Sequence, residues 1–88
     1  MFVVDPDPND ATLRFYYYLS RSAAVQLEML SINGRRFAII DSGRQSAGDH
    51  IIYWSANNIN DGIYLIKFSV GEEIAIYNIS VIQQENIA

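Results

Sequence analysis

The chain has 88 residues, half of them hydrophobic, and carries a formal net charge of -4 with no cysteine. This length fits one domain, and a hydrophobic content this high excludes a chain that is disordered by composition. The sequence also argues against disulfides and thiolate metal sites, membrane insertion, and nucleic-acid binding, because it lacks cysteine, a long apolar run and clustered basic residues.

Residues 1–11 predict a polar linker that leads into the domain. Pro6 and Pro8 fix φ and favour extended neighbours, and acidic and amide side chains surround them. Segment 5–10 begins like a calcium-binding loop, but it lacks the glycine and the glutamate that such a loop requires. We therefore expect a linker here, with no metal and no cofactor.

Six later stretches alternate between apolar and polar residues or are rich in β-branched and aromatic side chains, as strands are. They cover residues 12–19, 24–30, 35–40, 49–54, 63–70 and 74–82. Asn33-Gly34 predicts a hairpin because both residues tolerate positive φ. Residues 41–48 and 55–62 are predicted to be loops. Stretch 63–70 is apolar on both faces, which predicts a central strand that is covered on each side.

The glycines and asparagines fall between these stretches, and no segment keeps a helical period. We therefore predict an all-β fold, an antiparallel immunoglobulin-like β-sandwich of about seven strands over residues 12–82, with a tail over residues 83–88. Alternation assigns one set of side chains to the core and another to the outside. The core set is Leu13, Phe15, Tyr17, Leu19, Val25, Leu27 and Met29, and the outward set is Arg14, Tyr16, Tyr18, Gln26 and Glu28.

The only histidine and the only tryptophan lie four residues apart in the segment GDHIIYW, residues 48–54. They could form part of an active site or one strand of a core. A catalytic or zinc-binding histidine needs partners that converge on it, and nothing in the spacing of the acidic residues indicates such convergence. Alternation puts His50, Ile52 and Trp54 on one face, so we expect a structural role for all three. No catalytic motif is apparent elsewhere, and we expect a protein that is not an enzyme.

Two tyrosines invite a different interpretation. Tyr16 and Tyr18 share the outward face of their strand, where exposed rings could stack on sugars. The alternative is that they pack under a loop or against a neighbouring domain. Both remain open at this stage.

Several segments together resemble a bacterial family of immunoglobulin-like domains. The segments are DPNDATLRF, SINGRRF, AGDHIIYWSANNINDGIYLIKF and NISVI, in this order, across residues 7–82. The family comprises the C-terminal sorting domains of type IX secretion cargo and the similar domain of flagellar hook-capping proteins. The positions that match its signature are Pro8, Gly34, Gly48, Trp54, Gly62, Tyr64, Ile79 and Val81.

The resemblance implies a non-catalytic module attached to upstream domains of a parent chain. Such a module is read by an outer-membrane export machinery and passes through the periplasm to the cell surface or the extracellular space. Asn78 stands where the closing strand of the family commonly begins with Lys or Arg, which favours a plain accessory module instead.

Two alternatives are therefore retained beside the sorting function. One is a structural spacer or assembly domain of a surface or flagellar protein, which contacts a neighbouring protein. The other is a carbohydrate-binding accessory module. Sandwiches of this kind can also exchange a terminal strand, so a strand-exchanged homodimer is a further expectation.

Overall fold

The computed structural model of the protein describes residues 2–6, 12–56 and 59–81. These residues form seven strands: β1 (Phe2–Pro6), β2 (Thr12–Leu19), β3 (Ala23–Ser31), β4 (Arg36–Gln45), β5 (Gly48–Ser55), β6 (Gly62–Val70) and β7 (Glu73–Val81). None of the described residues is helical, so no helix among them is long and apolar enough to cross a membrane.

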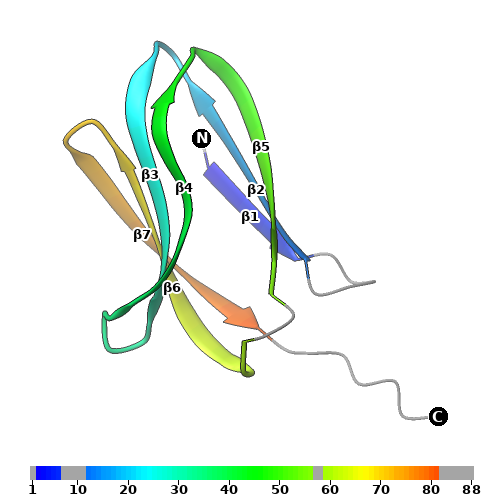
Figure 1. The fold of residues 1–88 in the computed structure, drawn as a ribbon. Helices are drawn as coiled ribbons and strands as arrows, with labels where there is room; N and C mark the ends of the chain where they lie inside the picture. The colour runs from blue at the N-terminus through cyan, green and yellow to red at the C-terminus, as the bar shows by residue number, and fades with distance from the viewer. Residues whose placement is uncertain (1, 7–11, 57–58, 82–88) are drawn as a thin grey trace.

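The strands form two antiparallel sheets that face each other (Figure 1). One sheet has the order β1-β2-β5 and the other the order β4-β3-β6-β7. The predicted all-β sandwich of about seven strands is thus confirmed. Strand β4 pairs with β3, whereas the fourth strand of a constant-type immunoglobulin domain pairs with the fifth.

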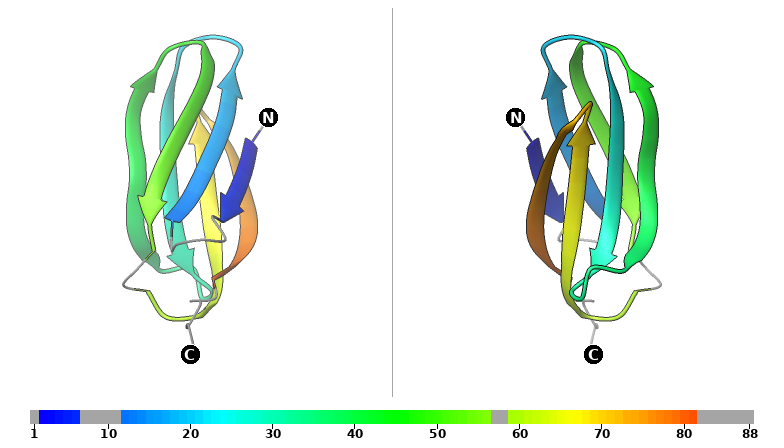
Figure 2. Two further views of the ribbon diagram at one scale, coloured as in Figure 1. Left: turned by 90° about the vertical axis from the view of Figure 1, so that its right-hand side faces the viewer. Right: turned by 90° about the vertical axis from the view of Figure 1, so that its left-hand side faces the viewer.

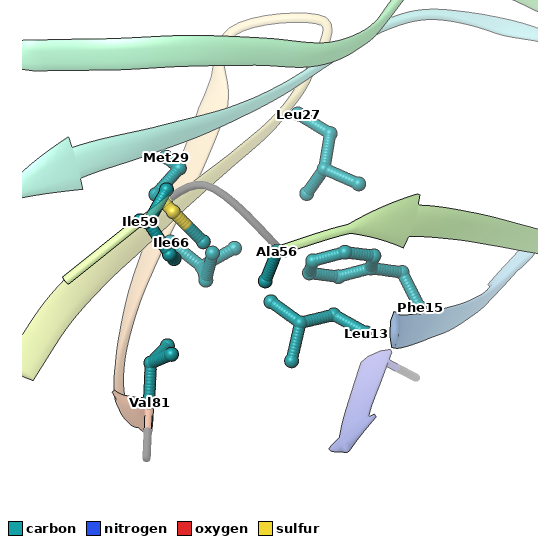
Figure 3. Packing of buried hydrophobic residues seen from close by; sticks show 8 residues of the cluster. All are labelled: Leu13, Phe15, Leu27, Met29, Ala56, Ile59, Ile66 and Val81. Carbon is teal, nitrogen blue, oxygen red and sulfur yellow. The ribbon is translucent and has the colours of Figure 1, made fainter. Parts of the chain in front are cut away.

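Alternating sequences in β2 and β3 produce the core. The inward side chains from Leu13 to Leu19 and from Val25 to Met29 are buried, as their spacing predicts, because successive residues of a strand point to opposite faces. The inward side chains of the two sheets meet in the space between the layers (Figure 3). The main cluster consists of Leu13, Phe15, Leu27, Met29, Ala56, Ile59, Ile66 and Val81.

A smaller cluster fills the end of the sandwich where β2 ends and β3 begins. Its buried members are Tyr17, Leu19 and Val25. The partly buried Phe68 and Val70 of β6, the neighbour of β3, also pack against it. This end is therefore closed by fewer fully buried residues than the centre.

Residues 2–6, which we expected to belong to the polar linker, form strand β1. Phe2 pairs with Tyr17 and Val4 with Phe15, so the backbone of this short segment is held as a strand by its pairing with β2. Phe2 also stacks on Phe68, with 4.7 Å between the ring centroids. Pro6 ends the pairing, in keeping with its missing N–H. Residues 7–11, including Pro8, and the tail 83–88 lie outside the described residues.

Residues 41–45, which we expected to be a loop, belong to strand β4. They continue the ladder with β3, from Leu27 opposite Asp41 to Ala23 opposite Gln45. The register shifts twice along this pair, so β4 carries extra residues that disturb its alternation. Both shifts fall opposite residues 36–41, whereas residues 41–45 pair regularly, so it is the pairing with β3 that makes this polar segment a strand.

Strand β6 is central, as predicted, because β3 and β7 pair with its two sides. The expectation that both of its faces are covered is wrong. Ile66 is fully buried on the inner face, while Ile63 on the outer face is about half exposed, at 51%. The predicted hairpin at Asn33-Gly34 is present between β3 and β4. Gly34 adopts a φ of 88° and donates its N–H to the Ser31 carbonyl at 2.9 Å.

Candidate interaction surfaces

His50 and Trp54 lie on the inner side of β5. The His50 ring stacks on Tyr17, with 5.0 Å between centroids. Its Nε2 lies 2.7 Å from the Ser46 carbonyl oxygen, to which an Nε2–H donates. Trp54 packs against the main core cluster. Across the described ranges, no group of three or more His, Asp or Glu residues could hold a metal ion.

The residues that match the family signature do not gather at one place. Gly34 lies in the β3–β4 turn, while Gly48 and Gly62 begin β5 and β6. Ile79 and Val81 contribute to the core from β7. Tyr64 packs on the same core, and its hydroxyl donates to the Asn60 carbonyl at 2.7 Å, which holds the connection before β6. Their described roles are turns and packing.

Four strands lie at the edges of the two sheets. They are β1 and β5 in one sheet and β4 and β7 in the other. An edge strand presents unpaired backbone groups to which another strand can add, and proteins block this with short strands, charges, proline or bulges. Strand β1 is short and ends at Pro6. Strand β4 has two register shifts and carries Arg36, Asp41 and Arg44. Strand β5 carries Asp49 and His50 in its first half.

Strand β7 has the weakest protection of the four. Glu73, its first residue, is its only charged residue, and the stretch from Ile74 to Val81 contains no proline and no glycine. Two isoleucines on its outer face are exposed, Ile74 at 59% and Ile76 at 57%. Figure 2 shows β7 at the margin of its sheet. An exposed, regular and apolar edge of this kind favours pairing with another strand.

The inner face of β7 holds the strand in place. Tyr77 stacks on Phe2 at 4.7 Å between centroids, and Val81 is buried in the main cluster. Along its whole length β7 pairs with β6, from Gly62 opposite Val81 to Val70 opposite Glu73. Among the strands that the structure describes, β7 is thus paired on one side and open on the other.

The outer face of the sheet β1-β2-β5 carries a second surface, which we call the tyrosine face. It consists of Val3, Tyr16, Tyr18, Ile51 and Tyr53, and Tyr53 is its most exposed ring, at 66%. A shallow hollow on this face is lined by Val3, Arg14, Tyr16 and Ile51. The expectation that Tyr16 and Tyr18 point outward is confirmed for the residues of β2.

Tyr16 is the polar centre of this face. Its hydroxyl donates to Asp49 Oδ1 across the β2–β5 pair at 2.5 Å. This hydrogen bond is the main reason that the pKa of Tyr16 is raised, because the carboxylate accepts from the neutral phenol. Partial desolvation and the negative charge of Asp49 act in the same direction.

The opposite outer face, on the sheet β4-β3-β6-β7, contains a carboxylate that sequence alone did not mark. Glu28 points outward, as expected, yet only 4% of it is exposed. Gln26 donates to Glu28 Oε1 at 2.7 Å, and Arg36 lies 2.8 Å from the same oxygen. Gln26 belongs to the same strand as Glu28, whereas Arg36 comes from β4, so the ion pair depends on the sheet order.

Comparison of the chain with models of protein families, with curated proteins and with solved structures finds no match in any of the three.

Proposed function

We propose that this protein is a non-catalytic immunoglobulin-like sorting and interaction domain of a secreted bacterial protein, recognised by an outer-membrane export machinery of the type IX kind. The observation that carries the proposal is the open edge of β7. It is the last described strand, and it combines an edge that no other described strand pairs with and the exposed Ile74 and Ile76 on its outer face.

Strand addition at β7 is the mechanism that we propose for recognition. A receptor strand would form main-chain hydrogen bonds with the free side of β7, which supply affinity. The outward isoleucines would contact alternate receptor side chains, which supply specificity. Since β7 is already fixed against β6 and Phe2, little of the binding free energy would be lost in ordering it.

A secretion assay tests the proposal. Residues 1–88 are fused behind a periplasmic reporter enzyme in a bacterium that has type IX secretion, and reporter activity is compared between culture medium and periplasm. We expect most of the activity at the cell surface or in the medium. A reporter that stays in the periplasm would contradict sorting and would favour the structural spacer.

The edge itself is tested by Ile76→Lys. A lysine on an edge strand disfavours strand addition, so we expect export of this fusion to be lost. Ile63→Lys is the matched control, because Ile63 has similar exposure on the same outer face but belongs to the central strand β6. Equal export of the two variants would show that the β7 edge is not the recognised feature.

A second candidate function is carbohydrate binding on the tyrosine face. It is favoured by the exposure of Tyr18 and Tyr53, at 51% and 66%, together with the polar groups Arg14 and Asp49 on the same side of the sheet. Tyrosine offers an apolar ring for stacking and a hydroxyl for hydrogen bonds. Affinity electrophoresis on a panel of soluble polysaccharides tests this candidate, with Tyr53→Ala expected to abolish any retardation. A panel without retardation of the unaltered protein removes it.

A further inference from the structure

The turn between β3 and β4 presents an apolar side chain beside two cations. Ile32, at 68%, is the most exposed of the large hydrophobic side chains that the structure describes. Arg35 and Arg36 follow it and are also exposed, and residues 31–40 contain no acidic residue. Arg36 is paired with Glu28 but keeps 57% of its side chain exposed. Residues 31–36, which we call the hairpin tip, therefore form a basic and apolar projection on a chain of net charge -4.

Hydrogen bonds hold the hairpin tip in one shape. Gly34 donates its N–H to the Ser31 carbonyl at 2.9 Å, and Ser31 donates its N–H to the Arg35 carbonyl at 2.8 Å. The Ser31 hydroxyl donates to Asn33 Oδ1 and accepts from the Arg35 N–H at 3.3 Å. Since the turn is already ordered, little conformational freedom would be lost when the tip binds a partner.

An acidic hollow lies between the β2–β3 turn and the β6–β7 turn and has a volume of about 600 Å³. The Gly71 N–H donates to the Ala24 carbonyl at 2.9 Å, which ties the β6–β7 turn to the start of β3. Neither glutamate of the hollow forms an ion pair within the described part of the chain. The apolar side chains and the charged rim of the hollow comprise Leu19, Phe68, Val70, Arg21, Glu72 and Glu73.

The hairpin tip and the acidic hollow lie at opposite ends of β3. The ladder between β3 and β6 places Val70 opposite Val25 at one end and Tyr64 opposite Ser31 at the other. Figure 1 shows the β3–β4 turn and the β6–β7 turn at opposite ends of their sheet. One copy therefore cannot place its own tip in its own hollow, but it offers one of each to neighbouring copies.

We propose that the hairpin tip of one copy binds the acidic hollow of a second copy, so that copies of this chain associate end to end. Ile32 enters the apolar part of the hollow, and Arg35 approaches Glu72 and Glu73. The two surfaces match in charge and in polarity, which is what selects a second copy as the partner. Because the surfaces differ, each added copy leaves one free tip and one free hollow. The contact involves no strand addition at β7 and stands apart from the proposed sorting function.

Arg21 opposes this contact. It lies on the rim of the same hollow and would repel the arginines of the incoming tip. Ion pairs between exposed side chains also contribute little to affinity, so the burial of Ile32 supplies most of it. We therefore expect weak association, which becomes strong where copies are held close together.

Sedimentation of the full chain over a range of concentrations tests the proposal. We expect the average mass to rise with concentration and to pass the mass of two copies. Ile32→Ser should raise the dissociation constant by about tenfold or more, the effect of losing a buried isoleucine side chain. Ile51→Ser is the matched control, because Ile51 is 55% exposed on the tyrosine face, and it should leave the association unchanged. A chain that stays monomeric up to its solubility limit would overturn the proposal.

Charge variants separate this contact from general self-repulsion. Replacing both Glu72 and Glu73 with lysine brings the formal net charge from -4 to zero, which by itself favours association. The proposed contact predicts the reverse, a loss of association. Arg21→Ser makes the chain more negative, yet the proposed contact predicts tighter association. Changes that follow the net charge in these two variants would overturn the proposal.

A mixing experiment tests the end-to-end geometry. The Ile32→Ser variant keeps an intact hollow, and the double lysine variant keeps an intact tip. Each should be largely monomeric alone, while an equimolar mixture should form pairs and stop at two copies, which also shows that both variants are folded. A mixture that stays monomeric would overturn the proposal. So would an unaltered chain whose mass levels off at two copies, because a closed dimer would then form instead of a chain.

Discussion

Replacing Tyr17 with phenylalanine should stabilise the protein. The Tyr17 side chain has no solvent exposure, and its hydroxyl has no hydrogen-bond partner within the described residues. Its ring packs on Phe68 at 4.9 Å and on His50 at 5.0 Å between centroids, and phenylalanine keeps both contacts. A buried polar group without a partner costs about 1–3 kcal/mol. After allowance for the small void that the oxygen leaves, we expect the free energy of unfolding to rise by about 1 kcal/mol.

Urea and thermal unfolding followed by circular dichroism measure this gain, which corresponds to roughly 4–8 °C in melting temperature. Tyr18→Phe is the control: that side chain is half exposed, so its change should stay within about 0.5 kcal/mol. A Tyr17→Phe variant less stable than the original by more than about 1 kcal/mol would refute the reasoning, because the hydroxyl would then have a partner.

The same variant has an expected pH dependence. Burial raises the pKa of Tyr17 above its ordinary value of 10.0, and the negative charge of Asp41 adds to the effect. The folded state therefore holds this proton more tightly than the unfolded state, and the associated stability is lost as the pH rises above 10. Tyr17→Phe has no such proton, so its advantage over the original protein should widen above pH 10.

Two further variants test the outer faces. Asp49→Asn should lower the pKa of Tyr16 towards 10.0, since the hydrogen bond to Asp49 is the main reason that this pKa is raised. The ring NMR signals of Tyr16, followed through an alkaline titration, measure the pKa. An unchanged pKa would contradict the cross-strand hydrogen bond. Arg36→Ala should lower the free energy of unfolding, measured with urea, by about 1–2 kcal/mol. This loss is smaller than the loss from breaking a fully buried ion pair, because Glu28 is buried but Arg36 is more than half exposed. Arg35→Ala, at an exposed turn position, should change little, and equal effects of the two substitutions would count against the ion pair.

The strands with regular alternation were predictable from sequence. From Leu13 to Leu19 in β2 and from Val25 to Met29 in β3, every second side chain is apolar and buried, so the period of two determines both the strand and its inner face. The placement of His50 and Trp54 follows from the same rule. The hairpin at Asn33-Gly34 was predictable because its backbone conformation requires a residue that tolerates positive φ.

Features that depend on a neighbouring strand were not predictable in this way. Strand β1 is too short to show a period, and it becomes a strand through its pairing with β2. Residues 41–45 of β4 are polar, yet they continue a ladder whose other half is β3. Glu28 was correctly placed on the outside, but its burial depends on Arg36 from the next strand.

The sheet order was likewise absent from the sequence pattern. Alternation along Glu73–Val81 predicts a strand but does not say whether one or both of its sides are paired. That information comes from the order β4-β3-β6-β7, which leaves β7 at the edge. The candidate interaction site therefore required the structure.

Amide hydrogen exchange along β7 tests the central claim most directly. If β7 is an open edge, the amides that donate to β6 should exchange slowly and those on the free side quickly, so that protection alternates from residue to residue between Ile74 and Val81. A control is available in β6, which is paired on both sides and should be protected throughout. Uniform protection of the β7 amides in dilute, monomeric protein would show that the free side of the strand is already paired. That result would contradict the proposed recognition by strand addition.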